Sequence, residues 1–201
     1  MGRQNPAKGR GTTAANTIAL KENYTEITFW AAFKSGDREV FSALFRNYYP
    51  LLVQYGSKIC SDPSALEDCI QDLFIELWQS PAHTQVSSVK AYLLKSLKYK
   101  LYKLFRQQQP VQSTDTAFDT MAFEISHENF LVDREEEQFK AHEIINAVNK
   151  LPNRQKEIVY LKIYKGFSYE EISEVMGINY QVARNLFYQS LKSLRQLLPH
   201  K

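Results

Sequence analysis

The side chains between positions 180 and 192 have the chemistry that reads DNA. Guanidinium groups suit guanine edges and phosphates, amides suit adenine edges, and ammonium groups suit phosphates. Helical spacing places these polar side chains on the outward face: Tyr180, Gln181, Arg184, Asn185, Tyr188, Gln189 and Lys192. They belong to the segment 151–198, whose order of helix, break, short helix, turn and long helix is typical of a helix-turn-helix module. We therefore predict binding in the DNA major groove. The alternative is a plain three-helix packing unit with a solvated polar face.

The ends of these predicted helices are marked by residues with known capping chemistry. Gly166 and Gly177 follow two of the helices, where glycine adopts the left-handed conformation at little cost. Ser168 and Glu171 have the spacing of a capping box, and Asn179 can cap the last helix. The apolar residues expected on the buried side are Ile172, Val175, Met176, Ile178, Val182, Leu186 and Leu194.

The segment 61–78 is acidic and contains no Lys or Arg. Its carboxylates are Asp62, Glu67, Asp68, Asp72 and Glu76, and an apolar stripe of Leu66, Cys69, Ile70, Leu73 and Leu77 predicts one amphipathic helix. Asp68, Asp72 and Glu76 are four residues apart, so like charges stack on one exposed face at a cost of roughly 0.2–0.5 kcal/mol per pair. A basic partner docked on this face would offset that cost. A merely solvated acidic face is the alternative.

The segment 89–106 has the opposite charge and contains no acid. Its cations are Lys90, Lys95, Lys98, Lys100, Lys103 and Arg106, interleaved with Tyr92, Tyr99, Tyr102 and Phe105. Cations bind phosphates, and aromatic rings stack on unpaired bases for roughly 1–3 kcal/mol per base. We favour a nucleic-acid surface. The alternatives are a membrane-surface or calmodulin-like amphipathic helix, and a core helix with solubilising lysines.

Composition sets broader limits on the chain. Its 201 residues are 44% hydrophobic with a net charge of +3, too small to prove a nucleic-acid partner. We expect a cytoplasmic protein, because no secretory start or long apolar run is visible and Cys60 and Cys69 suit reduced, buried thiols. Those cysteines and His83 do not have the spacing of metal ligands. With no nucleophile–base motif and no phosphate-binding glycine loop, we expect neither an enzyme nor a cofactor.

The fold that these patterns predict is all-α, with two small helical domains on a flexible linker. The expected boundaries are a disordered polar arm at 1–24, a helical domain at 25–106, an acidic linker at 107–137 and the helix-turn-helix domain at 138–201. The linker is predicted from its polar composition, which begins QQQPVQSTDTAFDT and ends DREEE.

Three of these segments, in this order, resemble a bacterial RNA polymerase sigma factor of the extracytoplasmic-function type, in the sigma-seventy family. SALEDCIQDLFIELWQ (64–79) is similar to the region-two helix, and VKAYLLKSLKYKLYKLFR (89–106) to the helix that handles the minus-ten element. The segment 151–198 is similar to region four, which reads the minus-thirty-five element. The resemblance covers about 27–198.

The resemblance implies partners and roles. Core RNA polymerase would be bound at its largest-subunit clamp, by Asp68, Gln71, Asp72, Leu73, Glu76 and Trp78, and at its flap. The minus-ten DNA would be melted by a loop that captures a flipped base and by the following helix: His83, Thr84, Gln85, Lys95, Lys98, Tyr99, Tyr102, Lys103 and Arg106. Promoter DNA and an anti-sigma factor, without insertion of this chain into a membrane, complete the expected partners.

The sequence departs from the family pattern at several DNA-facing positions. Tyr99 and Lys103 stand where Asn and Asp are common, and Leu186 and Gln189 stand where Arg is common. Fewer phosphate contacts predict modest affinity for free DNA. The other function considered is a helix-turn-helix regulator that binds an operator without being a polymerase subunit.

Overall fold

The computed structural model describes residues 30, 36–79, 86–108, 121–125 and 135–198, and every regular element in these ranges is a helix. The helices are α3 (Arg38–Gly56), α4 (Pro63–Gln79), α5 (Val89–Gln108), α6 (Glu135–Asn149), α7 (Asn153–Val159), the π-helix η3 (Tyr160–Tyr164), α8 (Tyr169–Met176) and α9 (Tyr180–Leu197). The predicted all-α class is confirmed. The arm at 1–24 and the predicted loop residues His83, Thr84 and Gln85 lie outside the described ranges.

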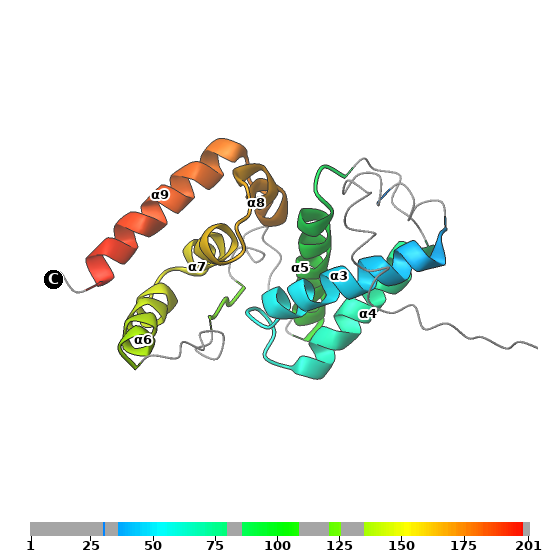
Figure 1. Cartoon of the computed structure of the whole chain (residues 1–201), viewed down its shortest axis with the longest axis horizontal. Coiled ribbons are helices and arrows are strands. Elements are labelled where there is room, and N and C mark those ends of the chain that lie inside the picture. The colour runs from blue at the N-terminus through cyan, green and yellow to red at the C-terminus, as the bar shows by residue number, and fades with distance from the viewer. Residues whose placement is uncertain (1–29, 31–35, 80–85, 109–120, 126–134, 199–201) are drawn as a thin grey trace, which may run out of the picture.

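Helices α3, α4 and α5 form the first bundle (Figure 1). Leu44, Ile70 and Leu97, one from each helix, are fully buried in a shared apolar core. The helices approach closely at Gly56, where an added Cβ would collide with the side chain of Leu66. The bundle fixes which faces of α4 and α5 remain outside.

Helices α6 to α9, with η3, form the second bundle, in which α7 packs on α9 (Figure 1). The predicted caps are confirmed: Ser168 and Glu171 form a capping box, the Asn179 side chain accepts the Val182 N–H, and Gly177 is left-handed with φ 64°. The predicted buried side holds with one exception. Val182 is 42% exposed, because it lies about 100° around the helix from the fully buried Ala183.

The two bundles touch, with α8 of the second against α5 of the first (Figure 1). Of the predicted flexible linker, 107–137, the structure describes 107–108, which end α5, 135–137, which begin α6, and 121–125, which is packed between the two bundles. Phe123 and Ile125 are each only 2% exposed. The Glu124 N–H donates to the Lys58 carbonyl at 2.8 Å, and the Asn149 amide both donates to and accepts from the Ile125 backbone.

The prediction of a flexible linker is therefore wrong for 121–125. Its polar composition concealed two apolar side chains at alternate positions, a spacing that lets one side of an extended segment be buried. The other linker residues between 109 and 134 lie outside the described ranges.

Candidate polymerase and nucleic-acid interfaces

The outward face of α9 is arranged as the sequence predicts. All seven predicted DNA-reading residues of α9, from Tyr180 to Lys192, are exposed, and Tyr188 reaches 70%. The Gln181 amide donates to Asn185 at 3.2 Å, and the Arg184 guanidinium lies over the Tyr180 ring. These contacts orient three donor groups along one helix face.

Arg195 extends this face, and sequence reasoning missed it. It is exposed and follows Tyr188 by seven residues, so both side chains lie on the same side of α9. The helical period was the signal that could have found it.

The exposed face of α4 matches the predicted polymerase-contact set in five of six positions. Asp68, Gln71, Asp72, Glu76 and Trp78 are all exposed. Leu73 is only 3% exposed, so its assignment to a contact surface is wrong. The reason is its place in the apolar stripe, which faces the bundle core. Ile75 was missed: it is 51% exposed and lies among the acidic side chains, next to the 37% exposed Trp78.

The carboxylates of α4 remain largely available to a partner. Glu76 pairs with Lys100 of α5 at 2.6 Å, yet the Glu76 side chain stays 68% exposed. Among the ion pairs of the described chain, none involves Asp68 or Asp72. The anionic face of α4 is therefore not neutralised by the neighbouring lysines.

Helix α5 presents only part of the predicted minus-ten set to solvent. Lys95, Lys103 and Arg106 are exposed, Tyr99 is 61% exposed, and Tyr102 is half-buried. Lys98 is 4% exposed and forms an ion pair with Glu157 of the second bundle. The prediction that Lys98 faces DNA is wrong for this arrangement of the bundles.

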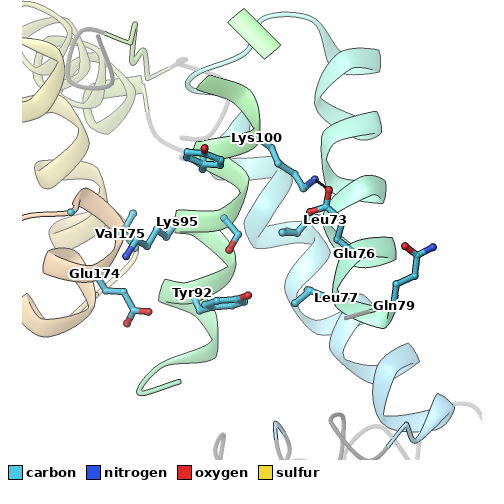
Figure 2. A pocket seen from close by; sticks show the side chains of 12 residues that line it. Leu73, Glu76, Leu77, Gln79, Tyr92, Lys95, Lys100, Glu174 and Val175 are labelled. Atoms are coloured by element: carbon cyan, nitrogen blue, oxygen red, sulfur yellow. Dashed lines mark ion pairs between the residues drawn. The ribbon is translucent and has the colours of Figure 1, made fainter. Parts of the chain in front are cut away.

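A groove of about 700 Å³ runs between the first bundle and α8 (Figure 2). Leu73 and Leu77 of α4 line one side, while Lys95 of α5 extends toward Val175 and Glu174 of α8. Two predicted DNA-contacting residues, Lys95 and Tyr99, therefore line a groove that also has a wall from the second bundle.

At the edge of the contact between the bundles, Glu171 of α8 binds two residues of the first bundle. Lys90 approaches it at 3.0 Å, and the Ser88 hydroxyl donates to it at 2.9 Å. Burial acts to raise the pKa of Glu171, but the Ser168 N–H, Lys90 and Ser88 outweigh burial and lower it. The charged form is thus stabilised by groups from both bundles.

The cysteines have no arrangement suited to metal binding. Cys60 and Cys69 are buried free thiols, and burial raises the pKa of Cys69. Across the described residues, no three His, Cys, Asp or Glu side chains gather as metal ligands. Within the same residues, no helix combines the length and apolar content that a membrane crossing requires.

Comparison with known proteins covers both bundles. Residues 44–111 match sigma-70 region 2, and residues 141–194 match sigma-70 region 4. The ECF RNA polymerase sigma factor SigX of Bacillus subtilis is 25% identical over 162 residues, which are 79% of this chain and 83% of that protein. SigK of Mycolicibacterium vanbaalenii is 18% identical over 168 residues, 81% of this chain and 83% of that protein.

Solved structures show the same fold. CnrH, solved in complex with the cytosolic domain of CnrY, has a TM-score of 0.57 at 17% identity, over 86% of this chain and 96% of that chain. The sigma factor RpoE of Bartonella quintana, solved with the anti-sigma factor NepR, has a TM-score of 0.52 at 19% identity, over 78% and 95%. With both sigma regions matched in order, the chain belongs to the sigma-70 family as an extracytoplasmic-function sigma factor.

Proposed function

We propose that this sigma factor binds core RNA polymerase through the exposed face of α4. Helix α9 recognises the minus-thirty-five element in duplex DNA, and α5 binds unpaired bases and phosphates of the minus-ten element. The observation that carries the proposal is the free anionic face of α4. Asp68 and Asp72 are exposed beside the exposed apolar side chains of Ile75 and Trp78. Such a surface suits a basic partner that also offers apolar contacts.

The proposed DNA surfaces differ in chemistry, as their tasks require. On α9, amide and guanidinium groups suit base edges in a duplex. On α5, the exposed Tyr99 lies among Lys95, Lys103 and Arg106, which suits unpaired bases and their phosphates. The protein supplies binding groups here and no covalent chemistry, so we infer that it has no catalytic activity of its own.

A charge reversal tests the polymerase contact. Asp72→Lys should weaken binding to purified core RNA polymerase at least tenfold, about 1.4 kcal/mol, because a cation would replace an anion at the centre of the contact. The matched control is Glu67→Lys, an identical charge change on the same helix. Glu67 is exposed but lies about 140° around α4 from Asp72.

The measurement is equilibrium binding, followed by transcription from promoter DNA with reconstituted holoenzyme. Unchanged binding by Asp72→Lys, or equal losses in both variants, would remove this face of α4 from the interface. If the chain bound its promoter at full strength without polymerase, the operator-binding regulator would be the better description.

An anti-sigma partner is proposed from the solved relatives. RpoE was solved in complex with the anti-sigma factor NepR, and CnrH in complex with the cytosolic domain of CnrY. We propose that this chain is also held by such a protein until its signal arrives. Co-expression with a candidate anti-sigma factor should abolish transcription by the holoenzyme.

A further inference from the structure

The centre of the contact between the bundles is a buried ion pair with a third member. The Lys98 ammonium lies 2.8 and 2.9 Å from the two carboxylate oxygens of Glu157. The Tyr55 hydroxyl donates to the same carboxylate at 2.6 Å. The side chains of Lys98 and Glu157 are 5% and 6% exposed. Each charge is therefore compensated by its partner and not by water. Burial, and then the Glu157 charge, hold the pKa of Tyr55 well above its ordinary value and keep the donor protonated.

The three residues come from helices of both bundles. Tyr55 belongs to α3, Lys98 to α5 and Glu157 to α7, so the contact joins the first bundle to the second. Shifting the bundles so that the pair broke while the interface stayed closed to water would cost several kilocalories per mole, because a lone buried ion is poorly solvated. The arrangement therefore favours one specific docked position.

The contacts around this centre also join the two bundles. The Phe123 ring packs against the rings of both Tyr55 and Tyr160, with centroids 5.9 and 5.5 Å apart. The Tyr160 hydroxyl donates to the Gln54 carbonyl at 3.2 Å, and the Lys165 ammonium contacts the Gln54 side chain. The ion pair thus lies within a packed interface that includes the described part of the linker.

The docked arrangement is too compact for the task of a sigma factor. The two promoter elements, as their names state, lie roughly 25 base pairs apart, which is about 85 Å along the duplex at ~3.4 Å per base pair. A compact chain of this length has a radius of gyration of only about 17 Å. Binding to both elements at once therefore requires the bundles to separate and the Lys98–Glu157 pair to break.

We propose that Tyr55, Lys98 and Glu157 form an interdomain clasp that holds the free protein closed, and that assembly with polymerase opens it. This inference rests on the proposed function, since opening matters only if both bundles must be placed at separate sites. The closed protein presents α4 to the polymerase clamp, but its second bundle is held against the first and cannot reach the flap, the second polymerase contact that the family resemblance implies. Only the open fraction completes the assembly, so the clasp weakens apparent affinity by that fraction.

The test is a comparison of two variants with the parent chain. Glu157→Ala leaves Lys98 without its anion and should open the clasp. The double variant Lys98→Met, Glu157→Met replaces both charges by apolar side chains and should stay closed, as buried ion pairs can be replaced by packed apolar groups. The control, Glu39→Gln, removes an exposed carboxylate in the first turn of α3.

Small-angle X-ray scattering of the free proteins reports closure, with circular dichroism to verify that each is helical. Glu157→Ala should increase the radius of gyration by at least roughly 3 Å, while the double variant and the control match the parent. Binding to core polymerase should become about tenfold tighter for Glu157→Ala, because the closed fraction is removed.

A folded Glu157→Ala protein as compact as the parent would overturn the clasp. Opening without a gain in affinity would overturn its role as a barrier to assembly. Should Glu157→Ala unfold, Tyr55→Phe, which removes only one hydrogen-bond donor, must give a smaller shift in the same direction, and no shift would overturn the proposal. Failure of the parent itself to bind polymerase would count against the proposed function, and the scattering result would still decide the clasp.

Discussion

Helices α9 and α5 were predicted to bind DNA by the same reasoning, yet the fold treats them differently. On α9, every predicted side chain points to solvent. On α5, Lys95 and Tyr99 are exposed, whereas Lys98 is buried against Glu157. The difference is one of neighbours. Helix α9 packs within its own bundle on one side only, whereas α5 packs within its bundle and against α8.

The difference between α9 and α5 shows which surroundings the residue pattern of a helix can predict and which it cannot. Apolar periodicity identifies the side of a helix that faces a core, but a polar side chain can equally face water, DNA or another domain. Lys98 and Lys95 are three residues apart and chemically identical, and only the second bundle distinguishes them.

The largest expected effect is on stability, at Lys98. Lys98→Ala should lower the free energy of unfolding by roughly 3 kcal/mol, because Glu157 then either stays buried without its cation or reaches water only by giving up the packed contact between the bundles. Lys95→Ala, on the exposed face of the same helix, should change it by less than about 0.5 kcal/mol. Urea denaturation followed by far-ultraviolet circular dichroism measures both. Equal effects would show that the two faces of α5 do not differ.

The next effect is on promoter binding, at Arg184 of α9. Arg184→Ala should weaken binding of the holoenzyme to promoter DNA by about 1–3 kcal/mol, since Arg is the side chain best suited to guanine edges and phosphates. Its stability should be unchanged because Arg184 is exposed. Lys150→Ala removes an exposed cation outside α9 and serves as the control in a fluorescence-anisotropy titration. A similar loss in the control would mean that only net charge matters.

A smaller effect concerns pH and the rim of the interface. The pKa of Glu171 is lowered from its ordinary value of 4.5, with burial opposed by Ser168, Lys90 and Ser88. A lowered pKa in the folded state stabilises the protein above the unfolded value, and the contribution is lost as pH falls through the folded value. Acidification below about pH 4.5 should therefore loosen the contact between α5 and α8. Scattering between pH 7 and 3.5 should show expansion that is reduced in Glu171→Gln; identical profiles would contradict this role.

The smallest effect is expected at the exposed ion pair of α5. Lys100→Met breaks the contact with Glu76, whose side chain is 68% exposed, and should cost no more than about 1 kcal/mol. Thermal unfolding compared with Lys98→Ala measures the contrast between an exposed and a buried pair on one helix. A loss as large as that of Lys98→Ala would mean that exposure does not separate the two pairs.

Local signals made much of this fold predictable. The capping box at Ser168, the left-handed Gly177 and the Asn179 cap depend on neighbouring residues alone, and all three are confirmed. The acidic face of α4 was predictable for the same reason, although Leu73 was assigned to both the core and the surface. Ile75 was missed because an exposed apolar residue carries no charge signal.

The contact between the bundles was not predictable from such signals. Lys98 and Glu157 are 59 residues apart, and Tyr55 and Glu157 are 102 apart. No local periodicity relates positions so distant. Phe123 and Ile125 did carry a local sign, since the polar Glu124 separates two large apolar residues, but the polar composition around them favoured a linker.

The docked segment 121–125 also decides how much slack the chain has. While Phe123 and Ile125 stay buried, the two bundles can move apart only as far as the short stretches 109–120 and 126–134 permit. Once they are released, the length of the chain from 109 to 134 sets the limit on the separation, at most roughly 85 Å. The range of spacings between the two promoter elements that the holoenzyme tolerates would then depend on the free energy needed to expose Phe123 and Ile125.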